Sequence, residues 1–245
     1  MDFEIKGKRA VVFGGSKGLG RAVAQALVAE GAKVAIVSRD ATNVKQTVEA
    51  LGVVGLNGDV SVPGTSETLL REAAHTMGGP VDILVINTGG PAKGSVETLT
   101  VDDWQAAFNN LWLAAVESIT TVLPGMKEAG WGRILVVTSI AAKEPQSGLL
   151  VSNSLRAGLL GMINSLSKDI SKFGITINAL MPGYTATDRM KELGVDAETF
   201  GARIPAGRLG KPSEFGAVAA FLASNQASYV TGQAIAIDGG YLNSI

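Results

Sequence analysis

The chain has 245 residues, 46% of them hydrophobic, which is enough for one sizeable core in a single domain spanning residues 1–245. The net charge of −1 and the lack of a basic run speak against nucleic-acid binding. The charged N-terminal segment is unlike a signal peptide, and no apolar run is long enough to predict a membrane span. We therefore expect a cytoplasmic protein. There is no cysteine and only one histidine, His75, so we expect neither disulfides nor a metal site.

The first predicted elements are a strand, a glycine-rich turn and a helix. Residues 11–13 are apolar, Gly14, Gly18 and Gly20 follow with the spacing G-x-x-x-G-x-G, and helix-forming residues occupy 21–28. A helix N-terminus presents unpaired N–H groups and a positive dipole end, and glycines let the backbone approach a bound group closely. The stretch therefore suits a phosphate. The alternative is an ordinary tight turn, and the rest of the chain has to decide between the two.

Apolar runs and helical patterns alternate through the rest of the chain. Short apolar runs predict further strands at residues 33–38, 53–56, 83–87, 133–139, 175–180 and 234–237. Helical patterns between them cover residues 42–51, 63–77, 101–126, 147–173 and 214–223. Residues 182–210 show no strong period, and we expect an irregular functional loop there, with a lid at about 185–210.

This alternation predicts an α/β fold, a doubly wound parallel sheet of seven strands flanked by helices. Ligands of such sheets bind beyond the carboxyl ends of the strands. The candidate site residues are therefore those that directly follow each predicted strand.

Several short motifs stand at these positions. They are the three glycines of the first turn, Asp59-Val60, Asn87-Thr88-Gly89, Pro182-Gly183 and Asp238-Gly239-Gly240, and a further candidate, Asn110, lies within the predicted helix 101–126. Together they resemble the short-chain dehydrogenase/reductase family, a Rossmann-type fold, and most of all its 3-oxoacyl-acyl-carrier-protein reductases. The resemblance covers the whole chain, and it implies a nicotinamide cofactor.

The end of the second strand bears on the choice of cofactor. NAD enzymes usually carry an acidic residue there, which binds the ribose hydroxyls. This chain has Ser38, followed by Arg39, with Lys17 in the glycine turn. Two cations at that corner favour a 2′-phosphate, so we predict NADP(H) in preference to NAD(H). The alternative is that Lys17 and Arg39 are ordinary solvated charges.

The resemblance, together with the charges at the end of the second strand, indicates the following cofactor-binding residues: Gly14, Ser16, Lys17, Gly18, Leu19, Gly20, Ser38, Arg39, Asp59, Val60, Asn87, Thr88, Gly89, Arg156, Pro182, Gly183, Thr185 and Thr187.

The catalytic set departs from the family pattern of Asn, Ser, Tyr and Lys. Asn110 and Ser139 match its first two members, but the positions of the Tyr and the Lys hold Ser152 and Arg156. A serine hydroxyl is a far weaker acid than a tyrosine, and an arginine stays protonated. Ser139 is still suited to polarise a carbonyl, and Arg156 to bind a ribose or orient a hydroxyl.

Another residue would have to supply the proton. Tyr184 follows Pro182-Gly183, beside the expected nicotinamide, and Lys143 lies four residues after Ser139. We hypothesise that one of them replaces the missing acid/base group. The alternative is that Tyr184 lines the pocket and Lys143 is solvated.

Two functions therefore remain open. The first is an NADP(H)-dependent oxidoreductase acting on a small-molecule carbonyl or alcohol, possibly a 3-oxoacyl thioester, with a non-standard catalytic set. The second is a cofactor-binding protein without redox turnover. Halohydrin dehalogenases, a related branch with Arg at the Lys position, rank lower because they keep the Tyr. The resemblance also implies a homotetramer, for which the apolar side chains of Leu155, Leu159, Met162 and Ile163 would suit an interface or, equally, the core.

Overall fold

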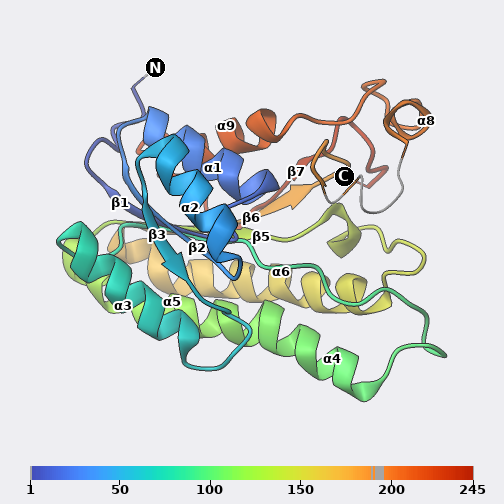
Figure 1. Cartoon of the computed structure of the whole chain (residues 1–245), viewed down its shortest axis with the longest axis horizontal. Coiled ribbons are helices and arrows are strands. Elements are labelled where there is room, and N and C mark those ends of the chain that lie inside the picture. The colour runs from blue at the N-terminus through green and yellow to red at the C-terminus, as the bar shows by residue number, and fades with distance from the viewer. Residues whose placement is uncertain (1, 189, 191–195, 245) are drawn as a thin grey trace.

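A computed structural model describes residues 2–188, 190 and 196–244. All seven strands form one parallel sheet in the order β3-β2-β1-β4-β5-β6-β7 (Figure 1). The strands are β1 (Arg9–Phe13), β2 (Lys33–Ser38), β3 (Val54–Asn57), β4 (Ile83–Ile86), β5 (Gly132–Val137), β6 (Ile175–Pro182) and β7 (Ala234–Ile237). The strand order reverses between β1 and β4, and this is where sheets of this kind bind their ligands.

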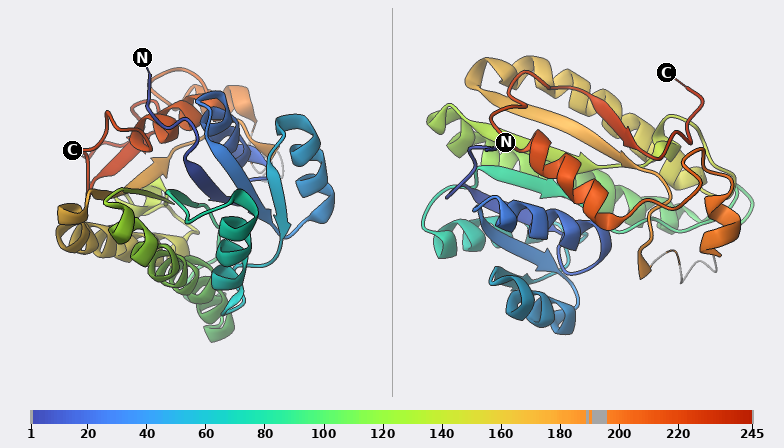
Figure 2. Two further views of the ribbon diagram at one scale, coloured as in Figure 1. Left: turned by 90° about the vertical axis from the view of Figure 1, so that its left-hand side faces the viewer. Right: turned by 90° about the horizontal axis from the view of Figure 1, so that it is seen from above.

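Helices cover both faces of the sheet. The α-helices in the described part of the chain are α1 (Gly18–Ala29), α2 (Ala41–Leu51), α3 (Thr65–Met77), α4 (Val101–Phe108), α5 (Ala114–Ala129), α6 (Leu150–Ile170), α8 (Ala197–Gly201) and α9 (Pro212–Leu222). In Figures 1 and 2, α1, α2 and α9 lie on one face, and α3, α4, α5 and α6 lie on the other. The predicted doubly wound parallel sheet of seven strands is therefore confirmed.

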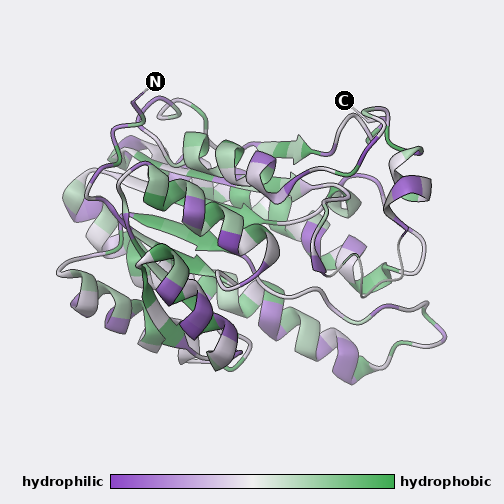
Figure 3. Cartoon of the chain, turned by 45° about the horizontal axis from the view of Figure 1, so that its top comes forward, coloured by the Kyte–Doolittle hydropathy of each residue, from purple (hydrophilic) through white to green (hydrophobic). Residues whose placement is uncertain are grey.

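Two apolar cores result, one on each face. Val12, Ile36 and Leu27 belong to the core under α1 and α9, while Val11, Ile119 and Leu159 belong to the core under α3, α5 and α6. Successive residues of a strand point to opposite faces, so a strand buried on both sides has to be apolar throughout. In Figure 3 the strands are mostly coloured as hydrophobic, whereas the helices around them mix hydrophobic and hydrophilic residues.

Several predicted boundaries differ from the structure. The predicted strand 133–139 ends at Val137, and the segment 147–149 forms a turn ahead of α6 rather than its first residues. The third strand lies one residue later than predicted, and β6 continues two residues further, to Pro182. Of the predicted lid, residues 189 and 191–195 lie outside the described residues, and the described part contains the short helix α8.

Helices α1 and α9 pack at unusually close range. A Cβ atom on Gly216 of α9 would stand 2.5 Å from the carbonyl oxygen of Ala22 in α1. No other residue type leaves room for this contact, because only glycine lacks a Cβ. The position of α9 on the sheet therefore depends on Gly216.

Replacement of Gly216 by Ala is expected to lower the free energy of unfolding by about 1–3 kcal/mol, because the two helices must move apart. Gly161 in the middle of α6 is the matched control, since its Cβ would meet nothing within 4 Å. Gly161→Ala should leave stability unchanged or raise it by up to about 1 kcal/mol. Urea unfolding of both variants measures the difference, and equal effects would contradict the packing argument.

Candidate functional site

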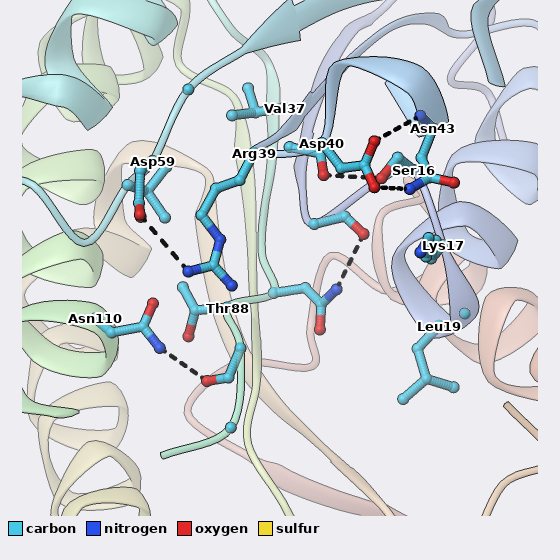
Figure 4. Close-up of a pocket in the computed structure, with 18 of the residues that line it drawn as sticks. Ser16, Lys17, Leu19, Val37, Arg39, Asp40, Asn43, Asp59, Thr88 and Asn110 are labelled. Atoms are coloured by element: carbon cyan, nitrogen blue, oxygen red, sulfur yellow. Dashed lines mark hydrogen bonds and ion pairs between the residues drawn. The ribbon is translucent and has the colours of Figure 1, made fainter. Parts of the chain in front are cut away.

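A cavity of about 410 Å³ lies at the carboxyl ends of β1, β2 and β4 (Figure 4). Predicted site residues make up most of its lining: Gly14, Ser16, Lys17, Gly18, Leu19, Ser38, Arg39, Asp59, Val60, Asn87, Thr88, Gly89, Asn110 and Thr187. The structure adds Val37, Asp40, Asn43, Gly58, Gly90 and Asp188. Most of these added residues are direct sequence neighbours of predicted ones, so a prediction extended by one residue on each side would have included them.

The glycine turn is shaped by close backbone contacts. Gly14 and Gly18 have φ values of +60° and +50°, which favour glycine. A Cβ on Gly20 would stand 2.2 Å from the carbonyl oxygen of Gly14. Helix α1 begins at Gly18, and the side chain of its N-cap residue, Lys17, makes no hydrogen bond to the first turn. The N-terminus of α1 thus lines the cavity beside a turn that favours glycine at positions 14 and 18 and requires it at position 20, which fits a bound diphosphate.

Hydroxyl and basic groups meet at the corner where β2 ends. The Ser16 and Ser38 hydroxyls are hydrogen-bonded at 2.8 Å, and the Lys17 side chain is exposed at the cavity. Asp40 lies one residue past Arg39, but its carboxylate caps α2 by accepting hydrogen bonds from the backbone and side chain of Asn43. The Asp40 carboxylate, although adjacent to this corner in sequence, is therefore already engaged by the protein.

Arg39 reaches across the cavity toward Asp59 (Figure 4). One guanidinium nitrogen lies 3.6 Å from the Asp59 carboxylate, and 71% of the Arg39 side chain is exposed. Burial raises the pKa of Asp59, but hydrogen bonds from Ser61 and the charge of Arg39 lower it by more, so its pKa lies below the usual value. An exposed ion pair of this kind is weak and leaves Arg39 able to turn toward an anionic ligand.

Two asparagines fix the loop after β4. The Asn87 amide approaches the Gly14 carbonyl at 3.5 Å, and the Asn110 amide donates to the Gly89 carbonyl at 2.8 Å. Asn110 lies in a π-helical turn (Asn109–Leu113) that joins α4 to α5. Such wide turns inside helices occur frequently at functional sites. The predicted position of Asn110 in one long helix is correct, but the sequence pattern did not reveal the wider turn.

Of the six predicted catalytic residues only Asn110 lines this cavity, and the other five lie outside its lining, three of them around the end of β5. Ser139 begins a short 3₁₀ turn (Ile140–Ala142), and its hydroxyl accepts a hydrogen bond from the Ala141 N–H at 3.1 Å. Ser152 and Arg156 are buried on α6, each with 7% of its surface exposed. The Arg156 guanidinium donates to the carbonyl oxygens of Val137 and Thr138. α6 packs against the 3₁₀ turn, so these residues share one region around the end of β5.

Tyr184 packs in an aromatic cluster, with its ring centroid 4.8 Å from that of Phe200 and 5.0 Å from that of Tyr241. Burial, together with hydrogen bonding to Tyr241, raises the pKa of Tyr184 to about 12. A group that exchanges protons in catalysis works best with a pKa near the operating pH, so this shift makes Tyr184 a poorer acid/base group. Lys143 is exposed on the loop after the 3₁₀ turn.

The remaining predicted positions follow β6. Pro182 ends the strand, and a Cβ on Gly183 would stand 2.7 Å from Asp238. Thr185 is buried, and Thr187 reaches the cavity opposite Gly18. Sequence reasoning missed that Glu144 accepts hydrogen bonds from the backbone N–H groups of Asn243 and Ser244, which tie the chain's last described residues to the loop after Ser139.

Within the described part of the chain, no cluster of His, Asp or Glu side chains is arranged to hold a metal ion. No helix in that part is both long and apolar enough to cross a bilayer.

Known proteins resemble this chain over nearly its whole length. A family model described as enoyl-(acyl carrier protein) reductase matches residues 14–242. The 3-oxoacyl-acyl-carrier-protein reductase FabG of Salmonella typhimurium is 35% identical over 243 residues, which cover 98% of each chain. The NADPH-dependent reductase BacG of Bacillus subtilis is 31% identical and covers 97% of this chain and 99% of its own.

Solved structures with a similar fold also include reductases. The L-sorbose reductase of Gluconobacter frateurii, complexed with NADPH and L-sorbose, has a TM-score of 0.93 at 29% identity, over the full length of both chains. YwfH, an NADPH-dependent reductase involved in bacilysin biosynthesis, has a TM-score of 0.92 at 31% identity and covers 98% of this chain and 100% of its own. The fold and the sequence thus point to the same group of reductases.

The environment of Tyr184 predicts a phenolate that forms only near pH 12. The folded state holds this proton more tightly than the unfolded state, so its contribution to stability is lost as the pH rises from 10 to 12. Near-ultraviolet absorbance should show a late transition that Tyr184→Phe removes. The control variant Tyr229→Phe, at a fully exposed ring, should retain it. A transition of Tyr184 at or below pH 10 would contradict the burial argument.

Proposed function

The chain belongs to the short-chain dehydrogenase/reductase family, and on that basis we propose that it is an NADP(H)-dependent oxidoreductase acting on a small-molecule carbonyl or alcohol. The choice of NADP(H) rests on the groups that lie at the end of β2. This corner presents hydroxyls and cations, while the Asp40 carboxylate caps α2 and the Asp59 carboxylate is held by Ser61 and forms an exposed ion pair with Arg39. Relatives named as NADPH-dependent or complexed with NADPH support this choice.

The residues of the cavity would hold the cofactor in distinct ways. The N-terminus of α1 behind the glycine turn would bind the diphosphate through backbone N–H groups. Lys17, Arg39 and the hydroxyl of Ser38 would bind the 2′-phosphate through charge-assisted hydrogen bonds. When bound, the nicotinamide supplies or accepts a hydride.

The chain's own residues would prepare the carbonyl. The Ser139 hydroxyl would donate a hydrogen bond to the substrate oxygen and stabilise the negative charge that develops there. Asn110, through its bond to the Gly89 carbonyl, would hold the loop after β4 in place. Of the two candidates for proton transfer, Lys143 is favoured over Tyr184, because burial moves the pKa of Tyr184 away from neutral.

The alternative is a cofactor-binding protein without redox turnover. The replacement of the family's Tyr and Lys by Ser152 and Arg156 favours it, whereas the retained Asn110 and Ser139 favour an enzyme. A homotetramer stays part of the proposal. Leu159 and Ile163 are fully buried within the protomer, so an interface would have to use more exposed side chains, such as Leu113 and Val116.

One prediction tests whether Lys17 binds the 2′-phosphate of the cofactor. Lys17→Ala should raise the dissociation constant for NADPH by roughly tenfold and leave that for NADH within about twofold, because NADH has no 2′-phosphate. Lys33→Ala is the matched control, since Lys33 is an exposed lysine at the opposite end of β2. Fluorescence titration of both variants measures the effect. An equal loss of both cofactors in Lys17→Ala would contradict the assignment.

Another prediction concerns turnover of a carbonyl substrate with NADPH. NADPH oxidation with a panel of ketones and 3-oxoacyl thioesters should reveal at least one substrate, and Ser139→Ala should lower kcat by roughly a hundredfold. Ser154→Ala, at an exposed hydroxyl on α6, is the control and should retain activity. Lys143→Ala and Tyr184→Phe then test the two proton donors. Tight NADPH binding without turnover on any substrate would favour the alternative function.

A further inference from the structure

Arg156 is a buried cation that donates hydrogen bonds to the backbone at the end of β5. Its Nη1 atom donates to the carbonyl oxygen of Val137 at 3.0 Å and to that of Thr138 at 2.8 Å. Only 7% of the residue is exposed, and it is not among the residues that line the cavity at the glycine turn. A guanidinium is always charged in proteins, so this burial requires strong acceptors.

The pairing of β5 with β6 explains why a donor is needed there. Val137 is in register with Leu180, and the Thr138 N–H donates to the Leu180 carbonyl at 2.8 Å. In a parallel ladder the next bond would run from the N–H of residue 182 to the Thr138 carbonyl. Residue 182 is a proline, which has no N–H. The sheet therefore leaves the Thr138 carbonyl without its donor, and Arg156 supplies one.

The position of this carbonyl matters because Ser139 follows it directly. Ser139 starts the 3₁₀ turn, with its hydroxyl accepting from the Ala141 N–H and its carbonyl accepting from the Ala142 N–H at 3.0 Å. Arg156 thus joins α6 to the last residues before Ser139. The planar guanidinium can bond two carbonyls from one nitrogen while the rest of the group stays in a fixed plane.

We propose that Arg156 is a positioning residue, which fixes the backbone of Ser139 by replacing the donor that Pro182 lacks, and that it does not bind the cofactor ribose. The importance of Ser139 rests on the proposed redox function, but the backbone role of Arg156 does not. It is therefore testable without cofactor or substrate.

Hydrogen exchange at the amides of residues 139–143 measures the backbone role directly. Arg156→Met keeps a long side chain but removes the donor, and it should speed exchange in this segment by roughly tenfold. Adding Pro182→Ala restores an N–H at residue 182, so the double variant should return toward the exchange rate of the wild type. Lys168→Met, at an exposed cation of the same helix, is the control and should change nothing.

Cofactor affinity separates this role from ribose binding. The dissociation constant for NADPH should stay within about twofold in Arg156→Met, because the guanidinium bonds the backbone. If Arg156→Met does not fold, Arg156→Lys replaces it and should give a smaller rise in exchange that Pro182→Ala again reduces.

Two results would overturn the proposal. One is unchanged exchange together with a tenfold or greater loss of NADPH affinity, which would assign Arg156 to the cofactor. The other is faster exchange that Pro182→Ala does not reduce in either background. A protein that binds no NADPH at all would refute the proposed function, yet the exchange data would still decide the role of Arg156.

Discussion

The contact between Gly20 and the Gly14 carbonyl sets the distance between α1 and the end of β1, and the cavity depends on that distance. With a Cβ at position 20 the helix would have to withdraw, since the clash at 2.2 Å is with backbone rather than with a flexible side chain. The same turn brings Asn87 of the neighbouring β4 loop close to Gly14. Because of this contact between Asn87 and Gly14, the glycine turn, the switch point of the sheet and the N-terminus of α1 form one surface.

Charge at this surface is arranged so that a polyanion meets few free carboxylates. Asp40 is engaged by Asn43, and Asp59 by Ser61 and Arg39. The cations, by contrast, lie on exposed side chains that can rotate. Asp40 and Asp59 keep partners in Asn43 and Ser61 even when Arg39 turns away from Asp59, and this is the physical reason for favouring NADP(H).

The sheet was predictable because its central strands are buried on both faces and hence continuously apolar, as in Ile83–Ile86. The glycine turn was predictable because Gly14 and Gly18 have positive φ values and Gly20 tolerates no Cβ. The end of β5 was not, because the prediction treated Thr138 and Ser139 as strand by their residue types. Whether the strand continues through Thr138 and Ser139 depends on Pro182, which has no N–H to offer, and on Arg156, which bonds the Thr138 carbonyl instead. Neither residue is a neighbour in sequence. The Arg39–Asp59 pair and the π-helical turn at Asn110 likewise arise only from tertiary packing.

The proposed cofactor site rests on the geometry of the cavity, whereas the proposed catalytic role of Ser139 concerns the region around the end of β5. The most direct test of the central claim is a titration of the purified wild-type protein with NADPH and, separately, with NADH. We predict that NADPH binds at least about tenfold more tightly, as expected for one charge-assisted phosphate contact or more. Equal affinity for the two would contradict the assignment of the β2 corner, and binding of neither would contradict the assignment of the cavity itself.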